Sequence, residues 1–184
     1  MADFVSRAGE KLQHALNTFN ISIRGLVVGD FGSSTGGFVD CLLQNGAKKV
    51  YSVDTSYGEL AWKLRQDKHV VVMERTNAMH VNLPEKMDLI TVDVGWTKQV
   101  NILPNVFNNL KKGGYVISLI KPHYEAPREF LTKGKLIDDK LEEVLQSVEN
   151  QIEGIGGKVL QETKSPILGE KGKNREFLFL IKAN

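Results

Sequence analysis

The chain has 184 residues, of which 41% are hydrophobic and 25% charged, and its formal net charge is +2 at pH 7. This length and composition predict one domain over residues 1–184 with a core of its own, and they exclude a disordered or fibrous protein. Because no apolar run is long enough to span a membrane and the N-terminus lacks a signal-peptide pattern, we expect a cytoplasmic protein that does not contact membranes.

The N-terminal half of the chain alternates helices with strands. Apolar residues recur at helical spacing over residues 5–19, which predicts an amphipathic N-terminal helix. Short β-branched runs and amphipathic stretches then follow one another. We expect strands at residues 25–31, 49–54, 69–73 and 87–93, and helices at residues 38–45 and 59–66. This alternation is typical of parallel strands joined by helices.

The C-terminal half continues the pattern and then departs from it. We expect a helix at residues 101–110, a turn at 111–114, a strand at 115–120, a polar irregular segment at 123–137 and a helix at 138–152. Asp138 can cap that last helix. Strands at residues 158–163 and 176–181 have no helix between them, so they should pair as a hairpin. The fold class is therefore α/β, a doubly wound, mostly parallel sheet with one antiparallel strand from a C-terminal hairpin.

A glycine-rich turn follows the first strand, in the run Val27 to Gly37, VVGDFGSSTGG. Glycines permit a positive φ and let a ligand approach the backbone, so the turn can hold a small molecule; a purely structural turn is the alternative. The spacing fits neither a pyrophosphate-binding fingerprint nor a P-loop. An acid at the strand end, as D-x-G, is instead what S-adenosylmethionine (SAM) methyltransferases have. The candidate cofactor residues here are Asp30, Gly32, Ser33, Ser34, Thr35, Gly36 and Gly37.

Polar residues also stand where the other strands end, at the sheet edge where α/β proteins bind ligands. Asp54 is placed to accept the ribose hydroxyls of an adenosine, and Glu74 and Asn77 are expected near the adenine. Asp93, a further candidate cofactor residue, and Lys121 end neighbouring strands. Opposite charges fixed beside a cofactor cleft indicate a functional site more strongly than a solvated strand-end residue does.

Basic residues gather in two places, which favours contact with a phosphate backbone; a solvated face is the alternative for each. The candidates for RNA binding are Arg7, Lys11 and His14 on the first helix, and Lys164, Lys171, Lys173 and Arg175 near the C-terminus. The one cysteine, Cys41, lies on an apolar helix face and is expected to be a packing residue. Four scattered histidines give no ligand spacing, so we expect no metal.

Several motifs together resemble the TlyA (hemolysin A) family, a branch of the FtsJ-like ribosomal RNA 2′-O-methyltransferases. They are SRAGEKL at 6–12, DFGSSTGGFVDCLLQNGA at 30–47, LAWKLRQD at 60–67, ERTN at 74–77 and KP at 121–122. The resemblance extends over the chain from residue 4. It implies a Rossmann-like, SAM-dependent enzyme that methylates a ribose 2′-hydroxyl of ribosomal RNA, alone or within a ribosomal subunit, releases S-adenosylhomocysteine, and does not act on DNA.

The FtsJ-like enzymes use a Lys-Asp-Lys-Glu tetrad, which the resemblance assigns here to Lys11, Asp93, Lys121 and Glu176. Lys121 is expected nearest the hydroxyl, as a base when neutral or as a cation that stabilises developing negative charge. Lys11 would lower the pKa of Lys121, whereas Asp93 and Glu176 would raise it, and the residues alone leave both roles open.

The sequence departs from the family pattern on the substrate side. Val94-Gly95-Trp96 stands where the family has Ser-Phe after the aspartate, and His123-Tyr124-Glu125 replaces Gln-Phe-Glu. The family usually begins with an S4 RNA-binding domain, which we do not expect in this single FtsJ-like domain. Three other functions therefore stay open: an RNA-binding or ribosome-assembly module that retains a SAM fold, a small-molecule methyltransferase, and a pore-forming hemolysin, which the α/β pattern argues against.

Overall fold

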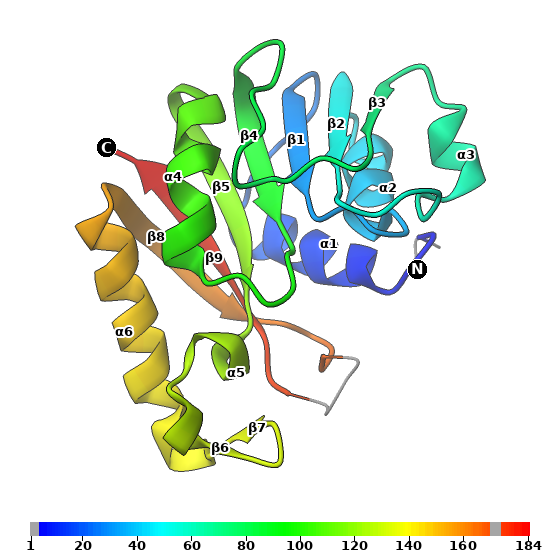
Figure 1. Ribbon diagram of the computed structural model, residues 1–184. Coiled ribbons are helices and arrows are strands. Elements are labelled where there is room, and N and C mark those ends of the chain that lie inside the picture. Colours follow the sequence, from blue (N-terminus) through cyan, green and yellow to red (C-terminus); the bar gives the residue numbers. More distant parts are fainter. Residues whose placement is uncertain (1–3, 170–173) are drawn as a thin grey trace.

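The computed structural model, which describes residues 4–169 and 174–184, is built on a seven-stranded sheet in the order β3-β2-β1-β4-β5-β9-β8 (Figure 1). Its strands are β1 (Val27–Phe31), β2 (Lys49–Val53), β3 (Val70–Met73), β4 (Met87–Val92), β5 (Leu110–Ile120), β8 (Gly157–Lys164) and β9 (Phe177–Ala183). Strands β1 to β5 are parallel, and β9 runs antiparallel to both β5 and β8. The predicted fold class and hairpin are confirmed.

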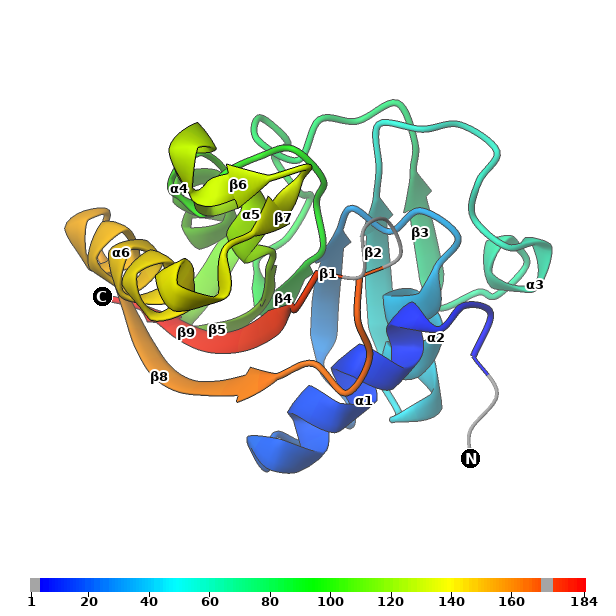
Figure 2. The same cartoon turned by 90° about the horizontal axis from the view of Figure 1, so that it is seen from below.

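Helices cover both faces of this sheet. On one face lie α1 (Ala8–Thr18), α2 (Gly37–Gln44) and α3 (Trp62–Arg65), and on the other α4 (Gln99–Asn109) and α6 (Leu141–Gly154) (Figure 2). Because successive side chains of a strand point to opposite faces, Val27 and Phe31 join the core under α4 and α6, whereas Val28 joins the core under α1 and α2. Burial on both faces explains the nearly continuous apolar strands.

Two elements differ from the predicted ones. The expected turn at residues 111–114 belongs to β5, which begins at Leu110; Gly113 has a φ of +82°, and the pairing with β4 shifts register between Met87 and Leu89. The strand therefore continues through an irregularity that absorbs the extra residues. The helix expected at residues 59–66 is reduced to the single turn of α3.

The segment after β5 is more ordered than predicted. It forms α5 (Pro122–Glu125), two 3-10 turns, η1 (Arg128–Phe130) and η2 (Asp138–Lys140), and a small hairpin of β6 (Leu131–Thr132) and β7 (Lys135–Leu136). Lys133 and Gly134 link the two short strands with φ values of +49° and +76°, the pattern of a tight two-residue hairpin turn. The hairpin lies apart from the sheet, beyond α5 (Figure 1).

The predicted helix cap at Asp138 is wrong. Helix α6 begins at Leu141, and its N-cap position is Lys140, which makes no side-chain capping bond. Asp138 instead begins η2, and its carboxylate pairs with Arg175 at 3.0 Å. The aspartate that local sequence would place at the helix start thus lies one 3-10 turn before it and pairs with a residue distant in sequence.

Candidate functional site

Two adjoining cavities open at the C-terminal edge of the parallel strands. The first, which we call the Asp54 cavity, has a volume of about 480 Å³ and is lined by Asp54, Asn77 and Trp96 among others. The second, the lysine cavity, has a volume of about 760 Å³ and is lined by Lys11 and Lys121 among others. Both are lined by Gly32, Ser34, Asp93 and Gly95. The shared lining makes them two halves of one cleft.

The glycine-rich turn forms the floor between the two halves. Gly32 and Gly36 have φ values of +89° and +100°, as the glycine pattern predicts. A Cβ atom at Gly32 would overlap the Asp93 carbonyl oxygen, one at Gly36 would overlap α3, and one at Gly37 would overlap the hydroxyl of Ser6. These glycines therefore let the chain pack against itself, a structural role that the sequence left open beside the approach of a ligand.

Asp54 follows β2 and holds the turn in place. Its Oδ2 accepts a hydrogen bond from the Ser34 backbone N–H at 2.8 Å, and its Oδ1 accepts one from Ser56 N–H at 2.7 Å. Ser34 has a φ of +45°, which this contact helps to maintain. Ser33, Thr35 and Gly37 line the lysine cavity, while Gly36 lines neither.

The two residues expected near the adenine lie in different surroundings. Asn77 lines the Asp54 cavity, and its Oδ1 accepts a hydrogen bond from Met79 N–H at 2.9 Å. Glu74 lies outside the lining of both cavities; its carboxylate forms an ion pair with Arg65 of α3 and accepts a bond from Gly58 N–H at 2.7 Å. The structure therefore brings Asn77, and not Glu74, to the cleft beside Asp54.

Asp30 is fully buried inside the sheet and lines neither cavity. Its Oδ1 accepts a hydrogen bond from the Thr91 hydroxyl at 2.7 Å, and its Oδ2 has no hydrogen-bond partner among the described residues. Burial raises the pKa of Asp30 to about 7; the Thr91 bond opposes this shift, and the charges of Asp93 and Asp54 add to it. Its contact with a cofactor stays a prediction.

This raised pKa predicts a pH-dependent stability. The folded state holds the Asp30 proton more tightly than the unfolded state. The stabilisation of the fold by protonated Asp30 is therefore complete below pH 3.8 and is lost as the pH rises through about 7. As the pH rises from 4 to 8, the free energy of unfolding of Asp30→Asn should increase by about 2–4 kcal/mol relative to that of the wild type. Urea unfolding of both proteins at several pH values measures the difference; parallel pH profiles would contradict the assignment.

The four residues of the predicted tetrad come from four separate elements and all line the lysine cavity. Lys121, just after β5, pairs with Asp93, just after β4, with 2.6 Å between Nζ and Oδ1. Lys11 of α1 pairs with Glu176, just before β9, with 2.5 Å between Nζ and Oε2. Lys11 and Glu176 are buried, whereas the first pair is half-buried at the cleft surface. The fold thus gathers all four around one cavity.

The charge state of Lys121 follows from its neighbours. Burial alone would lower the pKa of Lys121, but the charge and hydrogen bond of Asp93 outweigh it, together with the charge of Glu176. The net effect is a pKa above the ordinary value, so the side chain is a cation at neutral pH. Its Nζ also donates to the Val94 carbonyl at 3.2 Å, which fixes its position.

The described residues of the two predicted basic patches lie in different surroundings. Arg7 is exposed and lines the lysine cavity, but His14 contacts β8, with its Nε2 2.9 Å from the Thr163 hydroxyl. Lys164 is exposed at the end of β8, and Arg175 pairs with Asp138. Lys171 and Lys173 lie outside the described residues. Among the residues predicted to bind RNA, the structure therefore brings Arg7 and Lys11 to the cleft.

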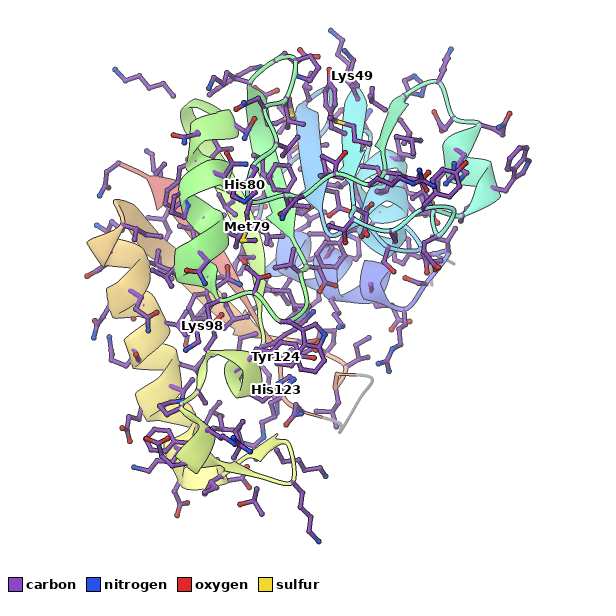
Figure 3. The ribbon with its side chains drawn as sticks, in the orientation of Figure 1. Lys49, Met79, His80, Lys98, His123 and Tyr124 are labelled. Carbon is purple, nitrogen blue, oxygen red and sulfur yellow. The ribbon has the colours of Figure 1, made fainter. Side chains whose placement is uncertain are left out.

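Three aromatic side chains, which the sequence placed on the substrate side without a role, stand at the cleft mouth. Trp96 is 82% exposed, and its ring centroid lies 4.8 Å from that of Tyr124. The ring centroids of Tyr124 and His123 are 4.1 Å apart. His123 and Tyr124 lie side by side on α5, near Lys98 (Figure 3). A signal existed: an aromatic residue follows each charged strand end, Asp93 and Lys121, by three positions.

Cys41 has the packing role that the sequence predicts. It is fully buried on α2, and burial raises the pKa of its thiol to about 12, so it is not a reactive thiolate. Over residues 4–169 and 174–184, no group of three or more His, Cys, Asp or Glu side chains could hold a metal ion. In the same residues, no helix combines the length and apolarity needed to cross a bilayer.

The sequence of this chain matches the model of the FtsJ-like methyltransferases over residues 4–182. It belongs to that family. Hemolysin A of Brachyspira hyodysenteriae is 41% identical over 181 residues, covering 95% of this chain and 75% of the relative. The 16S/23S rRNA (cytidine-2′-O)-methyltransferase TlyA of Mycobacterium tuberculosis is 34% identical over 184 residues, covering 96% of this chain and 68% of the relative.

Solved structures agree with this assignment. A protein from Streptococcus thermophilus that is provisionally named a hemolysin superposes on the whole of this FtsJ-like chain with a TM-score of 0.96 and 38% sequence identity, over 68% of its own length. The match extends over every element that carries the cleft. The resemblance inferred from the sequence motifs is confirmed.

Proposed function

We propose that this FtsJ-like methyltransferase transfers a methyl group from SAM to a ribose 2′-hydroxyl of ribosomal RNA in the cytoplasm. The observation that carries the proposal is the pair of lysine–carboxylate contacts, Lys121–Asp93 and Lys11–Glu176, on the wall of one cavity next to the glycine-rich turn. The cytidine-2′-O activity that the mycobacterial relative's name states supports the choice of substrate.

The Asp54 cavity fits the nucleoside part of SAM. A carboxylate held by two backbone N–H groups stands on its wall and has acceptor capacity left for ribose hydroxyls. The methionine part would then lie over the turn at Gly32 and Ser34, where the two cavities meet. When bound, SAM supplies a methyl group on a positively charged sulfur, which is already a good leaving group.

Removing the Asp54 carboxylate should weaken SAM binding. We expect Asp54→Ala to reduce affinity for SAM or S-adenosylhomocysteine by about 1–3 kcal/mol, because charged hydrogen bonds to the ribose are lost. Glu74→Gln should change it much less, since Glu74 lies outside the cavity lining and pairs with Arg65. Calorimetric titration measures both variants, and an unchanged affinity for Asp54→Ala would remove Asp54 from the site.

The role of Lys121 in this reaction is electrostatic. Because Lys121 is a cation, it can stabilise negative charge as it develops on the attacking ribose oxygen. Asp93 orients the ammonium group through the 2.6 Å contact and keeps it charged. The buried Lys11–Glu176 pair extends the same charge pattern along the cavity wall.

The transfer forms an O–CH₃ bond, breaks the S–CH₃ bond and releases the hydroxyl proton. Lys121 cannot accept that proton while it is charged, so the proton leaves for water or a neighbouring group as the new bond forms. Aligning oxygen, methyl carbon and sulfur in one line is the other contribution that the cleft makes.

Transfer of tritium from labelled SAM to intact ribosomal subunits and to naked ribosomal RNA tests the function, followed by mapping of 2′-O-methylated ribose. We expect label in the ribose of one or a few cytidines. A protein that binds SAM normally yet methylates no ribosomal substrate would overturn the proposal and would favour a binding or assembly module instead. Lack of transfer to DNA serves as a control for substrate class.

A further inference from the structure

A third cavity, of about 360 Å³, lies behind α5, and we call it the hairpin cavity. Its walls come from α5, from β7 and the turn after it, from the start of α6 and from the segments at residues 168 and 174–175. The Asn174 side chain donates to the Gly134 carbonyl at 3.2 Å, and Arg175 pairs with Asp138 at 3.0 Å. These two contacts tie the β6–β7 hairpin region to the segment before β9 and close the cavity on one side.

The hairpin cavity and the lysine cavity are separated by a single layer of residues. Lys121, Gly169 and Glu176 line the lysine cavity, whereas their sequence neighbours Pro122, Leu168 and Arg175 line the hairpin cavity. His123 lines both cavities. Sequence neighbours thus line the two cavities at three places, so a chain-like ligand bound in the lysine cavity would lie directly beside the hairpin cavity.

The composition of the hairpin cavity combines an apolar interior with basic groups. Leu136, Ile137, Leu141 and Leu168 supply apolar surface, and Ile137 and Leu168 are 40% and 43% exposed. Lys135 and Arg175 also line it, together with Asp138, whose carboxylate pairs with Arg175. A nucleobase with its phosphate matches this combination, since the apolar side chains can contact the flat faces of the ring and Lys135 can attract the phosphate.

We propose that the hairpin cavity binds the base of the nucleotide next to the methylated ribose in the same RNA strand. The inference rests on the proposed function, because it requires RNA in the lysine cavity. One nucleotide would then present its 2′-hydroxyl to Lys121 while its neighbour turns into the space between α5 and β7. RNA is read in this way when bases are splayed from a single strand and held separately.

His123 gives the cavity a polar contact for a base edge. Its Nδ1 is buried and has no hydrogen-bond partner among the described residues. Burial and the charge of Lys121 lower the pKa of His123, so the imidazole is neutral at pH 7 and carries one donor and one acceptor nitrogen. Because Nδ1 is buried, the part of the ring that lines the cavity, and not Nδ1, would meet the base edge.

Paired variants test the proposal with the full-length protein. Ile137→Glu puts a carboxylate at the cavity wall, and Leu160→Glu puts the same group on β8, at a residue with 41% exposure compared with 40% for Ile137. We expect Ile137→Glu to raise KM for naked ribosomal RNA about tenfold, because the added charge repels phosphates and fills the cavity, with kcat changed less than about threefold. Leu160→Glu should behave as the wild type.

A neutral variant separates charge repulsion from loss of the base site. Ile137→Gln should also raise KM, though less, and SAM affinity should stay unchanged in all three variants. Methyl NMR of Ile137 in the S-adenosylhomocysteine complex gives a second readout: a cytidine trinucleotide should shift this signal, and cytidine monophosphate should not.

Two results would overturn the inference without touching the proposed function. One is ribose methylation by Ile137→Glu with the same KM as Leu160→Glu and no trinucleotide shift at Ile137. The other is a KM effect that appears with intact subunits and not with naked RNA, which would assign the cavity to a ribosomal protein. Wild-type protein that methylates no ribosomal RNA would instead overturn the proposed function itself.

Discussion

Lys121→Ala is expected to abolish methylation of ribosomal RNA while leaving SAM affinity within about tenfold of the wild type. Lys121 lines the lysine cavity but not the Asp54 cavity, so its charge acts on the substrate oxygen and not on the nucleoside. Lys121→Arg should fail almost as badly, because a guanidinium has a different shape and reach. It would not reproduce the 2.6 Å contact of the lysine with Asp93. Single-turnover tritium transfer measures the rate, and calorimetry the affinity.

The same two strands supply a matched control. Lys111 and Asp88 form an ion pair, also 2.6 Å long, at the opposite ends of β5 and β4. Lys111→Ala removes a lysine–aspartate contact of the same kind far from the cleft and should leave the rate close to that of the wild type. Wild-type transfer by Lys121→Ala would show that another group stabilises the attacking oxygen.

Lys11→Met is expected to destabilise the fold by about 3–5 kcal/mol, the cost of leaving one charge of a buried pair without its partner. The Lys11 and Glu176 side chains are only 8% and 5% exposed, so the Glu176 carboxylate would be left largely desolvated. The double variant Lys11→Met/Glu176→Leu should recover most of the lost stability, because no buried charge remains. Both should lack methylation activity, which separates stability from catalysis.

Urea unfolding with a fluorescence readout measures these free energies. Lys49→Met is the control, because Lys49 forms an ion pair of similar length, 2.7 Å, with Glu85 at the surface, where the effect should be far smaller. If Lys11→Met and Lys49→Met proved equally mild, or if the double variant were no more stable than Lys11→Met, the buried pair would not have the energetic role assigned to it.

The spacing of apolar residues along the chain was sufficient to predict the sheet and its helices. Helices and strands each repeat their apolar face over a few residues, so a short stretch already shows which element it forms. The same local reasoning predicted that β8 and β9 pair, since no helix separates them. It also placed Asp54, Asp93 and Lys121 at one edge, because parallel strands all end there. It failed at the β6–β7 hairpin, where Asn174 donates to the Gly134 carbonyl, and at Asp138, which pairs with Arg175, because both partners are distant in sequence.

The sequence by itself thus determined the fold class, the family motifs and the candidate residues of the cleft. Only the tertiary structure decided which groups pair, because Lys11 and Glu176 are 165 residues apart and no local pattern measures their distance. It also decided that Lys121 is a cation, since its pKa depends on burial and on Asp93 together. Gly32 and Glu74 likewise took their roles from neighbours in space, Asp93 and Arg65. Charge and packing depend on distances between segments, which the folded chain alone sets.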